Sequence, residues 1–188
     1  MIILVVLVAS IAVALLRGGN LGYLGTLNIR WRGVIILGFL IQVLAFSSFW
    51  QDNRETKSLT QFAYLASLCL LLVALAANRH IPGVKLLTFG FLLNFIAIAA
   101  NGGFMPASLS ALQSTQLPLL QPGQVWSNSI GMGVDTRLPF LGDIFAIPKQ
   151  FPFSNVFSIG DILIALGAIY LIQKVLVATG SDREIVQA

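Results

Sequence analysis

Charged side chains are scarce in this sequence. Lysine, arginine, aspartate and glutamate make up only 10% of the 188 residues, whereas hydrophobic residues make up 57% and the mean hydropathy is +0.89. A soluble domain normally has about a quarter of its residues charged. So few charges cannot cover a water-soluble surface, and we expect the lipid bilayer to be the solvent for most of the chain.

Cysteine and histidine are nearly absent. The single cysteine, Cys69, cannot form an internal disulfide, and its place in an apolar run predicts a small buried or lipid-facing residue. The single histidine, His80, stands beside an arginine and outside any metal-ligand pattern, so we predict no metal and no cofactor. The net charge of +4 forms no basic stripe with interleaved aromatic residues, so we expect no nucleic-acid partner.

Five apolar runs divide the chain. A helix needs about 17 to 25 residues to cross the hydrocarbon core, and the first and fourth runs are at the short limit. Arg17 follows the first run and no charge precedes it, so we expect a retained helix rather than a signal peptide. We predict an all-α, polytopic transmembrane bundle, a single domain over residues 1–188, with about five spans. The spans cover residues 2–16, 33–50, 60–77, 84–100 and 156–177.

The basic residues predict the orientation of these spans, because cytoplasmic loops are enriched in lysine and arginine. Five spans with the N-terminus outside and the C-terminus in the cytoplasm place seven basic residues inside and four outside. The inner residues are then Arg17, Arg30, Arg32, Arg79, Lys85, Lys174 and Arg183, and the outer ones are Arg54, Lys57, Arg137 and Lys149. The predicted location is a cell membrane, crossed several times.

The long outer loop, residues 101–155, has six of the seven prolines and is unusually apolar. A solvated linker would be polar, and long loops of this kind are often functional. We predict that it lies on or dips into the outer interface and covers the bundle. Its expected anchors are Trp126 and the phenylalanines Phe104, Phe140, Phe145, Phe151 and Phe153.

Amides at the start of this loop are candidate binding groups. The motif Asn101-Gly102-Gly103-Phe104-Met105-Pro106 is typical of a helix C-cap followed by a proline stop. Alternatively, Asn101 turns inward to bind a ligand, together with Asn94 on nearly the same helix face. Two amides on one face can also simply join helices.

Two aspartates near the last run are the candidate catalytic residues. Acidic residues beside apolar membrane segments are costly and often functional, which draws attention to Asp143 and Asp161. For Asp161 the alternative is a capping box with Ser158. For Asp143 the alternatives are a turn residue or a salt bridge to Arg137. Arg137 and Asn155 complete the candidate binding residues.

These motifs resemble an uncharacterised family of small bacterial polytopic membrane proteins. The resemblance rests on Asn101-Gly102-Gly103-Phe104-Met105-Pro106, Leu138-Pro139-Phe140-Leu141-Gly142-Asp143 and Phe157-Ser158-Ile159-Gly160-Asp161, and it covers most of the chain. It implies a bacterial cell membrane and supplies no activity.

The stretch from Arg137 to Gly167 is also similar to the C-terminal part of prolipoprotein signal peptidase. That family has two catalytic aspartates at the outer face, and the resemblance implies that Asp143 and Asp161 occupy their places, with Arg137 near the family's arginine. The chain departs from the family pattern at Gly160, where the family has alanine.

Three functions stay open, and so does the question of whether the chain is an enzyme. The preferred one is a lipid- or peptide-binding module at the outer face, with membrane lipids as partners. The alternative is an aspartyl peptidase-like hydrolase, in which Asp143 and Asp161 share a proton, one activating water and the other protonating the substrate. A small transporter ranks third, because the spans contain few polar residues.

Overall fold

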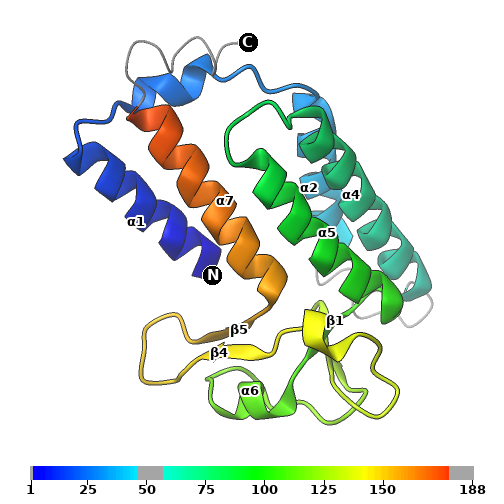
Figure 1. The fold of residues 1–188 in the computed structure, drawn as a ribbon. Coiled ribbons are helices and arrows are strands. Elements are labelled where there is room, and N and C mark those ends of the chain that lie inside the picture. Colours follow the sequence, from blue (N-terminus) through cyan, green and yellow to red (C-terminus); the bar gives the residue numbers. More distant parts are fainter. Residues whose placement is uncertain (1, 46–56, 178–188) are drawn as a thin grey trace.

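A computed structural model describes residues 2–45 and 57–177 of the chain. Figure 1 shows tilted helices side by side, with a smaller unit that contains strands at one end. Successive contacts place the helices in the order α1, α7, α5, α4, α2. Their bounds are α1 Ile2–Leu16, α2 Arg32–Ala45, α4 Lys57–Ala77, α5 Val84–Ala100 and α7 Ile159–Leu176; a short 3₁₀ helix, η1, spans Leu21–Thr26.

Each predicted apolar run forms a helix, with small differences at the ends. α5 has the bounds predicted for the fourth run. α4 begins at Lys57 rather than at residue 60, and α7 begins at Ile159 rather than at residue 156. Residues 46–50 of the second run, together with Arg54 and Arg183, lie outside the described residues.

Two of the described helices are long and apolar enough to cross a membrane. These segments are Leu59–Ala77 in α4 and Ile159–Leu176 in α7. The other three apolar helices have between 10 and 17 residues. Length and composition therefore support membrane association, and the full set of five spans remains a prediction.

Glycines bring the backbones of α5 and α7 into contact. A Cβ atom on Gly90 would lie 2.5 Å from the carbonyl oxygen of Gly160 and 2.9 Å from the nitrogen of Ile164. Farther along the same two helices, a Cβ on Gly167 would lie 2.7 Å from the nitrogen of Leu87 and 2.8 Å from the oxygen of Gly83. Small residues of this kind let helices approach closely where lipid supplies no hydrophobic driving force.

Asn78 connects the C-terminal end of α4 to the chain just before α2. This buried residue follows α4 and donates through Nδ2 to the carbonyl oxygens of Ala74 (2.7 Å) and Arg30 (2.9 Å). Its Oδ1 accepts from the backbone nitrogen of Arg30 at 2.7 Å. One neutral side chain thus caps its own helix and holds the chain just before α2.

Residues 101–158 form a compact unit, which we call the cap. It contains a three-stranded sheet in the order β1-β3-β2 and a two-stranded sheet of β4 and β5. β1 pairs parallel with β3, and the other two pairings are antiparallel. The elements are β1 Met105–Ala107, α6 Leu109–Gln113, β2 Val125–Trp126, β3 Ser129–Gly131, η3 Pro139–Leu141, β4 Phe145–Ile147 and β5 Asn155–Phe157.

The cap corrects two sequence predictions. The chain is mostly helical but not all-α, because the segment predicted as a loop forms short strands. The predicted aromatic anchors are also wrong in part, since Trp126 is 47% exposed and Phe140, Phe151 and Phe153 are more exposed still. The buried anchors are smaller or unbranched: Met105 joins a core cluster with Tyr64 and Ile98 of the helices, and Ala107 and Leu120 belong to a cluster within the cap.

We expect Gly90→Ala to destabilise the fold by about 1–3 kcal/mol, because the added methyl meets backbone atoms of α7 that cannot rotate away. Gly33→Ala is the control, since a Cβ on this helical glycine meets nothing within 4 Å. Thermal unfolding in detergent should show a lower midpoint for the first variant and an equal or higher midpoint for the second. Equal midpoints for both variants would contradict the close contact.

Candidate functional site

The three sequence motifs meet where the cap joins the helices. The first motif follows α5, the second contains η3, and the third contains the start of α7. Gly103, with φ +88, lies against Gln61 of α4, where a Cβ would come within 3.3 Å of the Gln61 side chain. Segments as far apart in sequence as Asn94 and Asp161 therefore form one junction.

Asn101 joins the first motif to the second. Its Nδ2 donates to the carbonyl oxygens of Ala97 and Arg137, both at 2.8 Å, and its Oδ1 accepts from the backbone nitrogen of Arg137 at 2.9 Å. Asn78 makes the same three hydrogen bonds at the helix ends that lie away from the cap. All polar atoms of the Asn101 side chain are thus used within the chain, which fits the capping alternative better than direct contact with a ligand.

Backbone pairing positions Asp143. Its nitrogen donates to the oxygen of Pro106 at 2.8 Å, and its oxygen accepts from the nitrogen of Ser108 at 3.0 Å. The residue thereby extends the edge of β1 through a parallel bridge to Ala107. The preceding Gly142 lies so close to β1 and to the Met132 side chain that a Cβ would collide with both.

The carboxyl group of Asp143 is buried and has no partner. The residue is 8% exposed, and within residues 2–45 and 57–177 no hydrogen bond or ion pair reaches its side chain. The predicted salt bridge to Arg137 is therefore not formed. Burial, and second the negative charge of Asp161, raise the pKa of Asp143 from 3.8 to about 7. Asp143 thus changes its charge near neutral pH.

Asp161 has the opposite environment. Its Oδ2 accepts from the backbone nitrogen of Ser158 at 3.0 Å, and the Asp161 nitrogen donates to Ser158 Oγ, also at 3.0 Å. This is the predicted capping box, now confirmed. Its Oδ1 accepts from Asn94 Nδ2 at 2.9 Å. Both carboxyl oxygens therefore have donors, as a carboxylate requires.

Asn94 connects this cap to the neighbouring helix. Its Oδ1 lies 2.7 Å from Ser158 Oγ, which also lies 3.0 Å from Asp161 Oδ2. A hydroxyl has one hydrogen, and the shorter distance indicates that Ser158 donates it to Asn94. Asn94 thus joins α5 to the start of α7, as one of the sequence alternatives predicted. A Cβ on Gly160 would collide with the Asn94 amide, which explains why glycine stands there.

Tyr64 of α4 is the third polar group at this junction. It is buried, its phenol is hydrogen-bonded to the side chain of Asn128 in the cap, and it lies within electrostatic range of Asp143 and Asp161. Sequence reasoning missed Tyr64 and Asn128. An aromatic residue inside an apolar run and an asparagine inside a loop give no local signal of such a meeting.

The other predicted residues lie farther out. The Arg137 side chain is exposed, and only its backbone is bound to Asn101. Asn155 lies in β5, paired with Ile147, and its side chain makes no hydrogen bond within the described part of the chain. In that same part, no three histidine, cysteine, aspartate or glutamate side chains come together as metal ligands do.

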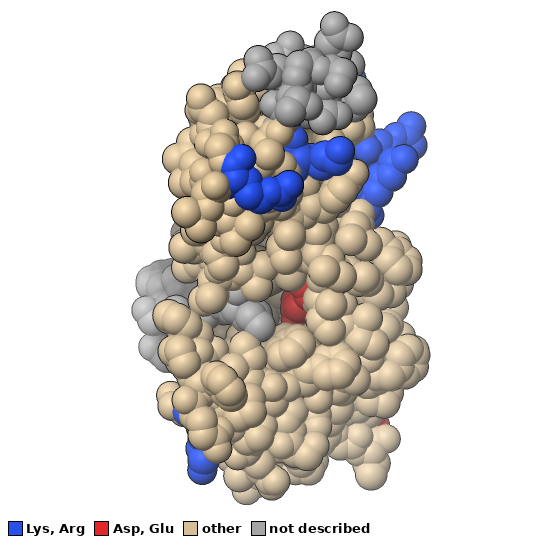
Figure 2. Space-filling model, turned by 60° about the vertical axis from the view of Figure 1, so that its left-hand side comes forward, with Lys and Arg blue, Asp and Glu red and all other residues tan. Residues whose placement is uncertain are grey.

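The space-filling view shows an acidic side chain at the floor of a hollow about midway along one face (Figure 2). Only three residues with a carboxyl side chain belong to the described part of the chain. Asp135 is exposed, and the other two, Asp143 and Asp161, lie at the junction. A carboxyl group that is almost buried yet reachable can accept a proton, an ammonium group or a hydrogen bond from a ligand.

Comparison with known proteins identifies the family. The model of a family of unknown function, DUF5317, matches residues 26–173, and the chain belongs to this family. The predicted membership of an uncharacterised family is thereby confirmed. No curated protein and no solved structure matches the chain, so the similarity to prolipoprotein signal peptidase has no support beyond the residues themselves.

We expect Asp143→Asn to stabilise the protein, and more so as the pH rises. A folded-state pKa above the ordinary value means that the folded protein holds its proton more tightly, so stability falls between about pH 4 and pH 7 and then stays level. The shift from 3.8 to about 7 corresponds to on the order of 4 kcal/mol. Because the amide variant carries no charge at this position, its stability should not fall in this pH range.

Thermal unfolding at pH 4 and pH 8 measures the effect. The stabilisation by Asp143→Asn should be large at pH 8 and small at pH 4. Asp135→Asn, a change at an exposed aspartate of the same cap, is the matched control and should show little difference at either pH. A variant that is less stable than the parent at pH 8 would mean that Asp143 is paired in solution.

Proposed function

We propose that this chain is a five-span membrane protein that binds an amphipathic lipid or peptide at the junction of cap and helices. Asp143 accepts a hydrogen-bond donor or a positive charge of the ligand. The observation that carries the proposal is the carboxyl group of Asp143, a residue only 8% exposed, which has no hydrogen-bond partner among the described residues. Native proteins seldom leave such a group unsatisfied without a functional reason.

Exposed apolar side chains support the membrane setting. Large hydrophobic residues point outward along the described helices, among them Val43 of α2 at 69% exposure and Phe62 of α4 at 71%. The helices have between 14 and 21 residues, so the shorter ones require a locally thin bilayer or flanking residues within it.

The distribution of charge supports the predicted orientation. Arg17 follows α1, Arg30 and Arg32 precede or begin α2, Arg79 follows α4, Lys85 begins α5, and Lys174 ends α7. Figure 1 draws these helix ends at the end of the molecule away from the cap, and Figure 2 shows Lys and Arg side chains gathered toward that end. Such a distribution is typical of a cytoplasmic side opposite an outer cap.

The surroundings of Asp143 suit an amphipathic ligand. Phe140, Ile144 and Phe145 expose apolar surface on the segment that includes Asp143. A ligand with a lipid-like body and an ammonium or amide donor would satisfy the buried carboxyl group and cover these side chains. Ordinary binding sites combine apolar walls with a few polar groups in the same way.

A hydrolase is the second candidate. The charge of Asp161 reaches Asp143, and a pair of interacting carboxyl groups can act as base and acid. Asp161, however, already accepts hydrogen bonds at both oxygens from Ser158 and Asn94. Because these donors stabilise the carboxylate and compete with water for its lone pairs, the binding function ranks first.

We expect cysteine labelling to report an outer cap. With Cys69 replaced by serine, Gln121→Cys in the cap should react with a membrane-impermeant reagent in intact cells. Gly25→Cys, in η1, should react only after permeabilisation; a Cβ there meets nothing within 4 Å, so the change is tolerated. Reaction of both cysteines from the same side would rule out the proposed orientation.

We expect Asp143→Asn to lose the bound ligand, because the amide carries no negative charge and accepts a hydrogen bond less strongly than a carboxylate does. The protein is purified from its membranes, and co-purified lipids and peptides are weighed by native mass spectrometry. The species that the parent retains should fall at least tenfold in Asp143→Asn and persist in Asp135→Asn. Full retention by Asp143→Asn would contradict the proposed site.

Asp161→Asn separates binding from hydrolysis. The side-chain oxygen of asparagine can still accept from the Ser158 nitrogen, so the fold should tolerate the change. A binding module should keep most of its ligand, whereas a hydrolase should instead accumulate uncleaved substrate on this variant, since removal of a catalytic acid or base typically slows turnover by about 10²–10⁴-fold.

A further inference from the structure

A groove of about 450 Å³ runs between α1 and α7, at the α1 edge of the row of helices. Its walls are apolar, formed by Val6, Ala9 and Val13 of α1 and Ile169 of α7. Val6 and Arg17, its outermost residues on the α1 side, are eleven positions apart, which corresponds to about 16 Å along a helix. The groove is thus long, narrow and suited to an extended hydrocarbon chain.

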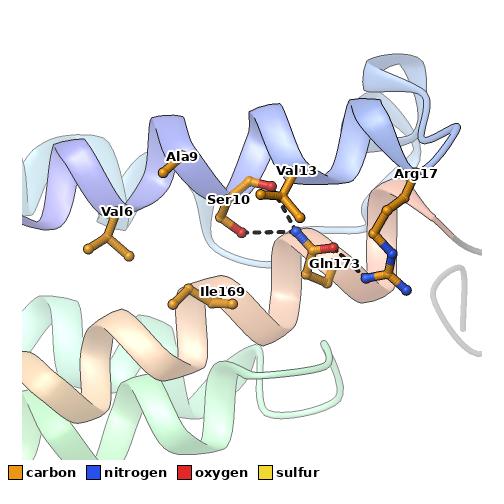
Figure 3. Close-up of a pocket in the computed structure, with 7 residues that line it drawn as sticks. All are labelled: Val6, Ala9, Ser10, Val13, Arg17, Ile169 and Gln173. Atoms are coloured by element: carbon orange, nitrogen blue, oxygen red, sulfur yellow. Dashed lines mark hydrogen bonds between the residues drawn. The ribbon is translucent and has the colours of Figure 1, made fainter.

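Polar groups extend from the middle of this groove, at Ser10 and Gln173, to its end at Arg17, whereas the end at Val6 and Ala9 is apolar (Figure 3). Gln173 of α7 donates through Nε2 to the backbone oxygen of Ser10 at 2.7 Å, and its Oε1 accepts from Arg17 Nη1 at 2.8 Å. A glutamine among apolar helices usually serves to join them, and here it also orients the guanidinium group. Arg17 therefore lies at one end of the groove, where one of its nitrogens is bound by Gln173.

Arg17 keeps its charge uncompensated within the described residues. Its one side-chain hydrogen bond there goes to a neutral amide, which leaves most of its five N–H donors free. The described aspartates, at positions 135, 143 and 161, belong to the cap and to the cap-side end of α7. A planar guanidinium group with free donors is well suited to bind a phosphate oxygen pair.

We propose that this groove binds an anionic glycerophospholipid of the cytoplasmic leaflet, with the phosphate on Arg17 and one acyl chain between α1 and α7. Charge complementarity selects the lipid over a second protein helix, because the cation stands where a headgroup would lie and the walls below it are apolar. Basic pockets between helices on the cytoplasmic side bind anionic headgroups in this manner. The inference rests on the proposed membrane orientation and not on the Asp143 site.

Lipid competition tests the proposal. The purified chain is equilibrated in mixed micelles with equimolar phosphatidylglycerol and phosphatidylcholine, and lipid adducts are counted by native mass spectrometry. The parent should favour phosphatidylglycerol, and Arg17→Gln should reduce this preference about tenfold, as the loss of one charged contact predicts. Arg79→Gln, at an exposed arginine of the same end, is the control and should keep the preference.

A second pair of variants tests the acyl chain. Ala9→Leu places a larger side chain in the groove and should reduce the adducts of both lipids, while the helix itself tolerates leucine. Ala12→Leu is the control, because Ala12 lines only the neighbouring groove of Leu4, Val8 and Phe153, whereas Ala9 lines both grooves. Asp143→Asn should leave phosphatidylglycerol binding unchanged.

Each contrary outcome is distinct. An unchanged preference in Arg17→Gln, or full displacement of phosphatidylglycerol by inorganic phosphate, would refute the lipid site while leaving the membrane orientation intact. Dimers in place of lipid adducts would show that a second copy fills the groove. A parent chain that takes up neither lipid would overturn both this inference and the membrane setting.

Discussion

The close approach of α5 and α7 at their glycines supports the rest of the cap-side structure. The cap begins where α5 ends and finishes where α7 starts, so the distance between these helices sets the distance between the two ends of the cap. Gly90 lies against Gly160, beside the bonds that join Asn94 to Ser158 and Asp161. Without this contact, neither the capping box nor the edge of β1 would be brought near Tyr64.

The two aspartates of the junction show how the same side chain acquires different properties. Asp161 lies at a helix N-terminus, where Ser158 and Asn94 donate hydrogen bonds to its two carboxyl oxygens. Asp143 is enclosed by the cap without donors, so burial raises its pKa into the neutral range. A carboxyl group with such a raised pKa costs stability at neutral pH, which is common at binding and catalytic sites.

Local sequence patterns predicted the helices but did not predict the long-range pairing of strands in the cap. Each apolar run carries its own signal, and Ser158 and Asp161 indicate the start of α7 by their spacing alone. The strands of the cap are two or three residues long, too short for alternation to show. The burial of Asp143 depends on its bridge to Ala107, 36 positions earlier, and no local feature of the sequence indicates that pairing.

Asn78 and Asn101 make the same three hydrogen bonds at opposite ends of the helices, each holding the backbone of an arginine. Both side chains are neutral and do not titrate, and neither clamp uses the guanidinium group of its arginine. Ionic strength and proton concentration, which loosen ion pairs, have no charge to act on here. Salt and pH should therefore leave these two connections intact, whereas the guanidinium groups of Arg30 and Arg137, which make no hydrogen bond within the described residues, can respond to the salt.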